Sequence, residues 1–160
     1  MRVGFGYDIH PFDDSRRLVL GGVEIGGAGL GGHSDADAVA HAVADALLGP
    51  AGLPDLGTLF PASDERWRDA ESMTLLADVA ARVGDAGWMV GNVDVVIAAE
   101  RPPLAPHTAA IASNIASVLS PASGEPPFVS VRAKRGEGLG AIGRGEGIAV
   151  WAVALVTRTL

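Results

Sequence analysis

The sequence predicts a single layered domain of the α/β or α+β class, in which helices cover one face of a mixed sheet of the four-stranded type. Segments with the period of a strand and segments with the period of a helix alternate along the 160 residues. This length is typical of one domain, and no repeat or linker divides it. We therefore expect residues 1–160 to form one domain.

The first strand is predicted over residues 2–10, because apolar side chains occupy every second position there. Asp8 and His10 are two residues apart in this strand, so their side chains point to the same face. Two short β-like segments, residues 18–20 and 23–25, are joined by a pair of glycines. This pattern predicts a hairpin, which a mobile glycine-rich loop follows.

The strongest helix pattern follows that loop. We expect a helix that begins near Asp35 and ends near Gly49, with Ser34 and Asp35 as N-cap candidates. Three ionisable residues recur at i, i+4 spacing and so share one face of this helix: Asp37, His41 and Asp45. A polar stripe among Ala and Val side chains requires solvent, a hydrogen-bond network or a metal ion.

The remaining elements are predicted from the same two periods. Further helices are expected at residues 70–86 and 106–119, and further strands at residues 88–99, 128–133 and 147–157. Residues 49–64 form a long loop rich in Gly, Pro and Asp. Loops of this length are more often functional than merely connective.

The composition limits the kinds of partner. The net charge of −7 argues against nucleic acids and anionic membranes, because both attract a basic surface. Cysteine is absent, so a metal must be held by nitrogen and oxygen. No targeting segment opens the chain, and its longest apolar run is shorter than the ~20 residues of a membrane helix. We expect a soluble, cytoplasmic protein.

Two interpretations of the histidines are open from the residues alone. Asp8, His10 and His41 would give a metal one oxygen and two nitrogen ligands, and would leave a fourth tetrahedral position for water or a phosphate oxygen. Alternatively, Asp8 and His10 form an ion pair at the strand end, and His41 is an ordinary hydrogen-bonded helix residue. If a metal binds, Asp37 and Asp45 would support His41 from one turn away on either side. Otherwise they would simply cap the helix and carry solvated charge.

The glycine-rich loop at residues 132–147 resembles a phosphate cradle in composition. Its glycines let backbone N–H groups approach a ligand, and Lys134, Arg135 and Arg144 supply positive charge. It is not a Walker A loop, because the GK[ST] ending is missing. Since no protein nucleophile stands out, we expect the nucleophile to belong to the substrate.

Five motifs occur in order along the chain: GYDIH, HSDADAVAH, DALLG, GNVDVVI and GRGEGIA. Together they closely resemble the 2-C-methyl-D-erythritol 2,4-cyclodiphosphate synthase family of the non-mevalonate isoprenoid pathway, over essentially the whole chain. The resemblance implies a homotrimer of α/β subunits whose active sites are shared between neighbours. It also implies a cyclising lyase reaction, which converts 4-diphosphocytidyl-2-C-methyl-D-erythritol 2-phosphate into the cyclodiphosphate and CMP.

The resemblance also assigns roles to individual residues. It implies zinc, or another divalent transition metal, at Asp8, His10 and His41, and a second ion, Mg²⁺ or Mn²⁺, bridging the diphosphate through Glu137. His33 is expected to assist the transition state. The implied substrate-binding residues are Ser34, Asp55, Leu56, Gly57, Phe60, Pro61, Ala62, Ser63, Asp64, Ala141 and Arg144. The implied nucleotide-binding residues are Ala99, Glu100, Arg101, Pro102, Pro103, Leu104, Ala105, Lys134 and Gly136.

The chain departs from the family pattern near the nucleotide. Lys134 and Arg135 stand where the family usually has threonines, so Arg135 replaces the threonine that stabilises the transition state and would contact phosphate by charge instead. Pro103 stands where lysine is common, Ala62 where aspartate is common, and Ala141 where a larger residue is frequent. These departures concern the nucleotide and erythritol contacts more than the metal site.

Two other functions are considered beside the synthase. The change to Arg135 suggests a non-catalytic trimeric homologue that binds a nucleotide or an isoprenoid diphosphate without turning it over. A zinc-dependent phosphoesterase would use water as its nucleophile and would release a linear product.

Overall fold

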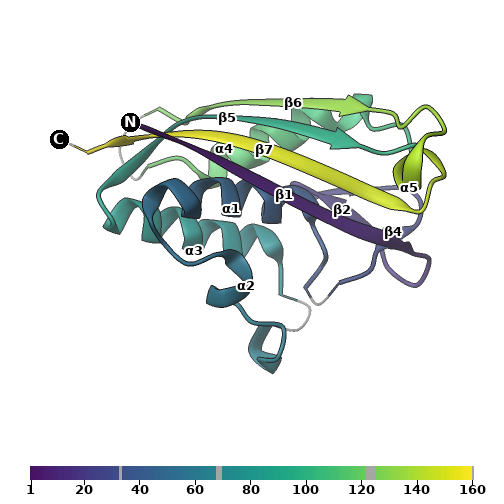
Figure 1. Cartoon of the computed structure of the whole chain (residues 1–160), viewed down its shortest axis with the longest axis horizontal. Helices are drawn as coiled ribbons and strands as arrows, with labels where there is room; N and C mark the ends of the chain where they lie inside the picture. Colours follow the sequence, from purple (N-terminus) through teal and green to yellow (C-terminus); the bar gives the residue numbers. More distant parts are fainter. Residues whose placement is uncertain (33, 68–69, 122–124, 160) are drawn as a thin grey trace.

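A five-stranded mixed sheet forms one layer of the molecule, and the longer helices form the other (Figure 1). The computed structural model describes residues 1–32, 34–67, 70–121 and 125–159. In spatial order the strands are β4 (Gly29–Leu30), β1 (Arg2–Asp13), β7 (Gly147–Arg158), β5 (Trp88–Ala98) and β6 (Phe128–Lys134). Neighbours are antiparallel except β5 and β6, which are parallel. The mixed sheet is thus confirmed, with the two-residue β4 as a strand that the sequence did not predict.

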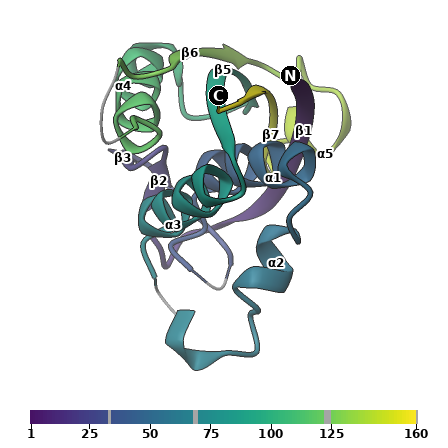
Figure 2. The ribbon, with the colours of Figure 1, turned by 90° about the vertical axis from the view of Figure 1, so that its left-hand side faces the viewer.

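Three helices cover one face of this sheet (Figure 2): α1 (Ala38–Ala51), α3 (Ser72–Asp85) and α4 (Thr108–Val118). The predicted hairpin is present as β2 (Leu18–Leu20) and β3 (Val23–Ile25), with the expected bounds. The shorter helical segments are α2 (Leu56–Leu59), η1 (Glu65–Trp67), η2 (Ala105–His107) and α5 (Gly140–Gly143). The predicted loops contain α2 and α5, which are too short for a periodic pattern to reveal.

The N-terminal strand packs very closely against helix α1. A Cβ atom at Gly4 would lie 2.0 Å from the carbonyl oxygen of Ala46, and one at Gly6 would lie 1.9 Å from that of Ala42. Only glycine fits at these two positions, because any side chain would overlap the helix backbone. The contact brings the second half of β1, with Asp8 and His10, beside the first turn of α1, which carries His41.

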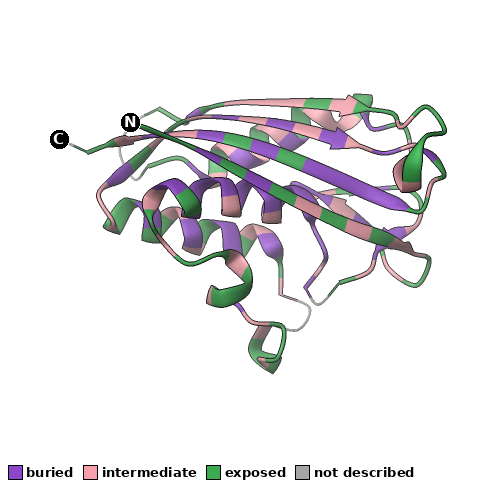
Figure 3. Ribbon diagram, viewed as in Figure 1, coloured by how far each residue is buried: buried purple, intermediate pink, exposed green. Residues whose placement is uncertain are grey.

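Exposed residues alternate along β1 with the two glycines that face α1 (Figure 3). The alternation was predicted correctly, but the apolar side chains lie on the exposed face. Val3 is 69% exposed, Phe5 is 64% exposed, and on the adjacent strand β7 Val153 is 42% exposed. An apolar sheet face of this kind is unusual on an isolated domain and typical of an interaction surface.

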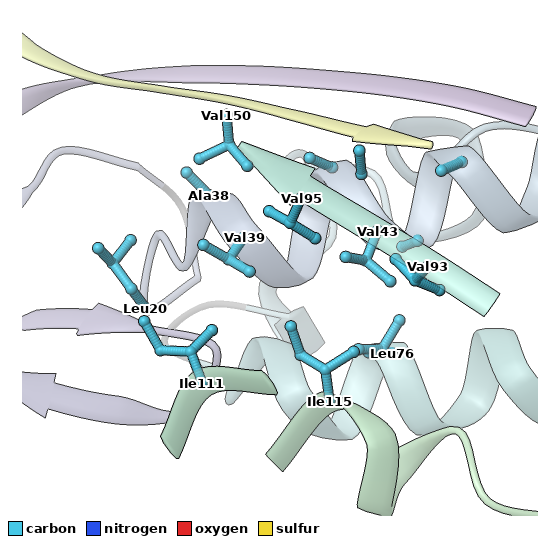
Figure 4. Packing of buried hydrophobic residues seen from close by; sticks show 14 of the residues in the cluster. Leu20, Ala38, Val39, Val43, Leu76, Val93, Val95, Ile111, Ile115 and Val150 are labelled. Atoms are coloured by element: carbon cyan, nitrogen blue, oxygen red, sulfur yellow. The ribbon is translucent and has the colours of Figure 1, made fainter. Parts of the chain in front are cut away.

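The hydrophobic core lies between the sheet and the helices, as Figure 4 shows in detail. Side chains of β5, β7, α1, α3 and α4 meet there, and many are completely buried. Val39 and Val43 of α1 belong to this core, with Val95 of β5 and Ile115 of α4. The core therefore fixes α1 against both the sheet and α3, and through α1 it fixes the position of His41.

The predicted boundaries hold to within a few residues. Helix α1 begins at Ala38, three residues later than expected, because Asp37 and not Ser34 or Asp35 is the N-cap. Its end lies at Ala51, with Gly52 rather than Gly49 as the left-handed C-cap. In the part of the chain that the structure describes, no helix is long and apolar enough to cross a membrane.

Candidate metal centre and active site

Three potential metal ligands converge between the second half of strand β1 and the first turn of helix α1. Asp8 and His10 point to the same face of the strand, and His41 reaches them from α1. Asp8 Oδ2 lies 2.8 Å from His10 Nε2 and 3.0 Å from His41 Nδ1. One donor atom from each residue lies within 4.8 Å of the other two. The three predicted ligands therefore form one group.

The other nitrogen of each imidazole is held from outside this group. His10 Nδ1 donates a hydrogen bond to the Gly31 carbonyl at 2.6 Å, because a carbonyl can only accept. His41 Nε2 lies 2.9 Å from Ser72 Oγ and 3.2 Å from Ser34 Oγ. These contacts fix the orientation of both rings, as the outer hydrogen bonds of metal-binding histidines do.

The donor set fits a divalent transition metal. Ligands about 2.0–2.2 Å from a tetrahedral Zn²⁺ are roughly 3.3 Å apart, and the observed separations are slightly shorter. Since the proton of neutral His10 is on Nδ1, its Nε2 lone pair faces a carboxylate oxygen that also carries lone pairs. Such an arrangement requires either an extra proton or a cation between the two atoms. One oxygen and two nitrogen ligands suit Zn²⁺.

The electrostatics of the group are those of a strongly coupled site. Burial raises the pKa of Asp8, but the hydrogen bonds and positive charge that His10 and His41 supply when their rings are protonated outweigh burial and leave that pKa far below its usual range. Burial lowers the pKa of His10, and the hydrogen bond and charge of Asp8 more than reverse this, so the pKa of His10 lies above its ordinary value of 6.5. The Asp8 carboxylate thus attracts positive charge, whether as protons or as a metal ion.

A cavity of about 230 Å³ opens over these ligands. Eight of the residues that line it were predicted as site residues from the sequence: Asp8, His10, Ser34, His41, Leu56, Gly57, Phe60 and Ala62. Trp67 and Leu75 complete the wall. Residues from four separate segments, including α2 and the turn after it, therefore meet at one site.

The rest of the predicted substrate loop supports this wall without lining it. Asp55 caps α2 by accepting a hydrogen bond from the Thr58 N–H at 2.8 Å, and hydrogen bonds from Thr58 lower the pKa of Asp55. Pro61 and Asp64 close a turn that contains Ser63, with the Asp64 N–H donating to the Pro61 carbonyl at 2.9 Å. Hydrogen bonds from Arg66 lower the pKa of Asp64.

The two aspartates beside His41 in the helix pattern are structural. Asp37 is fully buried and accepts N–H bonds from Gly21 and Gly22 of the hairpin turn and from Val39 and Ala40 of α1. Burial raises its pKa, against the lowering effect of these N–H groups. Capping was one of the two predicted roles, but the idea that Asp37 is solvated was wrong.

Asp45 joins helix α1 to the substrate loop. It accepts a hydrogen bond from the Leu56 N–H at 2.9 Å, at the first residue of α2. Burial raises the pKa of Asp45, while the Leu56 hydrogen bond lowers it. Asp45 therefore ties the predicted substrate loop to the helix that carries His41.

A second cavity, of about 390 Å³, is lined by most of the predicted nucleotide-binding residues, and we call it the nucleotide cavity after that prediction. It is lined by Ala99, Glu100, Pro102, Pro103, Leu104, Ala105, Ala133, Lys134 and Arg135. Glu100 organises this cavity, because its carboxylate accepts from Arg135 Nε at 3.2 Å and from the Gly136 N–H at 3.1 Å. The Arg135 hydrogen bond, with further charge and backbone contacts, lowers the pKa of Glu100. Of the predicted nucleotide-binding residues, only Arg101 and Gly136 are outside this lining. The Arg101 guanidinium instead lies 5.7 Å from the centre of the Phe12 ring.

The two cavities share no lining residue. Glu137 is exposed at the turn after β6, with a left-handed φ of 52°, and it does not join the metal-ligand group of the described residues. Ala141 lines a separate cavity beside His10, and Arg144 pairs with Glu146 at 2.6 Å. His33 lies outside the described residues.

The sequence profile of the YgbB family matches residues 1–157 of this chain. The chain belongs to the YgbB family. A relative named 2-C-methyl-D-erythritol 2,4-cyclodiphosphate synthase, from Syntrophomonas wolfei, is 52% identical over 159 residues, which is 99% of each chain. The bifunctional enzyme IspD/IspF of Anaeromyxobacter sp. is 53% identical over 98% of this chain, which spans only 40% of that relative. A solved 2C-methyl-D-erythritol-2,4-cyclodiphosphate synthase in a CDP-bound form is similar at 34% identity with a TM-score of 0.86, over 98% of this chain and 100% of that one.

Membership of the YgbB family confirms the resemblance that the five motifs suggested. Several residues at the site were nevertheless not predicted from sequence. Arg16 donates to the carbonyl oxygens of Gly32 and Ser34, and Ser72 contacts His41 from the start of α3. Trp67 also lines the metal cavity, and its Nε1 is a buried nitrogen without a hydrogen-bond partner among the described residues. Of these, only Ser72 had a recognisable signal, because serine is common where a helix begins.

Proposed function

We propose that this chain is a 2-C-methyl-D-erythritol 2,4-cyclodiphosphate synthase. The observation that carries the proposal is the convergence of Asp8, His10 and His41 in a cavity walled by the 56–62 segment. The same chain is 52% identical, over nearly its full length, to a relative with that name. The substrate is 4-diphosphocytidyl-2-C-methyl-D-erythritol 2-phosphate, and the enzyme class is a phosphorus–oxygen lyase that releases CMP.

The proposed reaction needs no protein nucleophile. An oxygen of the substrate's own 2-phosphate attacks the β-phosphorus of the diphosphate and forms a new P–O bond. The bond from the β-phosphorus to the oxygen that bridges both phosphates breaks, and CMP leaves with this oxygen and its electron pair. Atoms and charge balance without a co-reactant. The chain must therefore hold the two phosphates in line and exclude water.

Residues of the two cavities would divide this work. Leu56, Gly57 and Phe60 would enclose the methylerythritol carbons, and Ser34 would donate to a phosphate oxygen. The 99–105 segment would hold the cytidine. Lys134, Arg135 and the Gly136 N–H would neutralise charge that develops on the phosphates, and His33 would assist the same transition state.

Asp8, His10 and His41 would hold Zn²⁺, and Glu137 would contribute to a second divalent ion, Mg²⁺ or Mn²⁺, at the diphosphate. Metal ions at these places would polarise phosphate oxygens and neutralise their charge. The zinc proposal rests on the donor set and on the two imidazole rings, which are already oriented by Gly31 and Ser72. Glu137 is exposed and so is accessible to a bound diphosphate.

We also propose that the active unit is a homotrimer. Its support is the apolar outer face of the sheet, where Phe5, Tyr7 and Trp151 are solvent-exposed in the single chain. Burying this face between subunits would remove apolar surface from water. The separation of the metal cavity from the nucleotide cavity in one chain fits active sites completed by a neighbour.

The decisive experiment is turnover of the diphosphocytidyl substrate by the purified chain with Zn²⁺ and Mg²⁺. We expect CMP and the cyclic diphosphate in equal amounts, and no CMP after chelation of the metals. Tight substrate binding with no product would instead indicate a non-catalytic homologue. A linear phosphorylated product would indicate a phosphoesterase that uses water.

A further inference from the structure

A chain of hydrogen bonds leads away from the metal ligands into the protein. His41 Nε2 lies 2.9 Å from Ser72 Oγ, and the Ser72 hydroxyl donates to Asp35 Oδ1. The second oxygen of Asp35 accepts from the Ser72 backbone N–H at 3.2 Å. Ser72 is 1% exposed. Asp35 therefore holds Ser72 by both its hydroxyl and its backbone.

The direction of these bonds determines which nitrogen of His41 carries the proton. The single hydrogen of the Ser72 hydroxyl points to Asp35, because a carboxylate only accepts. Ser72 Oγ can then only accept from His41, so the hydrogen between them belongs to His41 Nε2. In neutral His41 this leaves Nδ1 with its lone pair, directed toward Asp8 Oδ2 at 3.0 Å. Nδ1 is thereby ready to bind a metal.

Ser34 cannot replace this arrangement equally well. Its hydroxyl is 3.2 Å from His41 Nε2 and 3.1 Å from Ser72 Oγ, and it accepts from the Ala36 N–H. If Ser34 donated to Nε2, the lone pairs of Nε2 and Ser72 Oγ would face each other at 2.9 Å without a hydrogen. The shorter contact therefore assigns the orienting role to Ser72.

We propose that Ser72 and Asp35 are positioning residues that select the metal-binding form of His41 and so set the metal affinity of the site. The proposal rests on the proposed metal site and deepens it. Ser72 contacts His41 at Nε2, whereas Nδ1 faces Asp8, and Asp35 contacts Ser72, so each residue acts through His41. Outer hydrogen-bond partners of this kind change metal affinity by about 10- to 100-fold when they are removed.

The test measures Zn²⁺ affinity by competition with a chromophoric chelator. The variants are Ser72→Ala, Asp35→Ala and the double variant, with Ser120→Ala as control, because Ser120 is an exposed serine whose hydroxyl donates to the Ala116 carbonyl. We expect each single variant to bind Zn²⁺ about 10- to 100-fold more weakly. Without Asp35, the Ser72 hydroxyl is free to donate to His41 Nε2, which favours the form with a proton on Nδ1.

The double variant separates positioning from other effects. If Asp35 acts through Ser72, its removal adds little once Ser72 is alanine, so the double variant should match Ser72→Ala. Additive losses would mean that Asp35 acts independently of the Ser72 hydroxyl, through its charge or its backbone hydrogen bonds, and would overturn the proposal. The visible spectrum of the Co²⁺-loaded protein should change in both single variants and stay unchanged in Ser120→Ala.

Folding and metal binding are distinguished by two more measurements. Unfolding of the metal-free variants reports a purely structural role, and lower stability with unchanged Zn²⁺ affinity would overturn the proposal. Should Ser72→Ala not fold, Asp35→Ala alone decides by its Co²⁺ spectrum and its affinity. If wild-type protein and His41→Ala bind Zn²⁺ equally, the proposed metal site itself is wrong, and the inference is wrong with it.

Discussion

The metal cavity and the nucleotide cavity are built in opposite ways. In the metal cavity each imidazole is held by a contact from the fold, the Gly31 carbonyl for His10 and the buried Ser72 hydroxyl for His41. In the nucleotide cavity the central contact joins two side chains, Arg135 and Glu100, which are 66% and 20% exposed. The first site depends on the whole fold, whereas the second depends on a surface ion pair.

This difference accounts for three of the departures expected from the family pattern, although Ala62, another of them, lines the metal cavity. Lys134, Arg135 and Pro103 all line the nucleotide cavity. Exposed ion pairs contribute at most about 1 kcal/mol, so residues there can change without loss of the fold. A buried polar group that loses its partner costs more, about 1–3 kcal/mol. We therefore expect substitutions in the metal cavity to have larger effects than substitutions in the nucleotide cavity.

Loss of a metal ligand should have the largest effect. His41→Ala removes one of three protein donors, so we expect Zn²⁺ affinity and turnover to fall by more than about 100-fold, the upper range for an outer-shell partner. Isothermal titration with Zn²⁺ and release of CMP measure the two effects. His107→Ala is the matched control, since His107 makes no side-chain capping bond at the start of α4. Equal Zn²⁺ binding by both variants would contradict the comparison.

Loss of the buried helix cap should have the next largest effect. Asp37→Ala leaves four backbone N–H groups without their acceptor, those of Gly21, Gly22, Val39 and Ala40. We expect the free energy of unfolding to fall by about 1–3 kcal/mol. Denaturant unfolding measures this, with Asp78→Ala as control, because Asp78 forms an exposed i, i+4 pair with Arg82. A similar loss in both variants would show that burial of the cap has no special importance.

The same contrast shows how far the sequence alone could lead. Period-two and helical patterns located the long strands and helices, and the D-x-H spacing with His41 predicted the three residues that converge as a possible metal-ligand group. The i, i+4 stripe placed Asp37, His41 and Asp45 on one helix face, yet only His41 belongs to the metal-ligand group. The hairpin turn bonds Asp37 and the start of α2 bonds Asp45. Contacts between segments distant in sequence decide such roles, and no local pattern contains them.

The exposed side of β1 shows a second such limit. Alternation in β1 predicts a strand but not which face is buried, because that depends on what packs against it. Gly4 and Gly6 face α1 since the helix backbone approaches too closely for a side chain. For the same reason Ser72 had no predicted role, because its contact with His41 exists only after α3 packs beside α1.

Replacing Asp45, which anchors the predicted substrate loop to α1, should have a smaller and pH-dependent effect on stability. Burial raises the pKa of Asp45 above its ordinary value of 3.8, so its stabilising contribution is complete below about pH 3.8 and is lost as the pH rises through the raised pKa. Asp45→Asn keeps an acceptor for Leu56 N–H without a charge. We expect the variant to gain stability relative to wild type as the pH rises, by less than about 1 kcal/mol because the site is partly solvated.

Unfolding of both proteins at several pH values measures this gain. Asp78→Asn serves as control, since Asp78 is exposed in its pair with Arg82. A difference between wild type and Asp45→Asn that does not change with pH would contradict the assigned cause. It would mean that the Leu56 hydrogen bond, and not burial of the charge, determines the contribution of Asp45.

Replacing the arginine of the nucleotide cavity should have the smallest effect on the fold. Arg135→Thr introduces the residue expected from the family pattern and removes an exposed ion pair with Glu100, so we expect little change in stability. If Arg135 contacts phosphate, losing one charge-assisted hydrogen bond of about 1.5 kcal/mol should raise KM roughly tenfold. Zn²⁺ affinity should stay unchanged, because no residue lines both cavities. Steady-state kinetics measures KM and titration measures Zn²⁺ affinity, with Arg82→Thr as control. Weaker Zn²⁺ binding by Arg135→Thr would show that the two cavities are coupled.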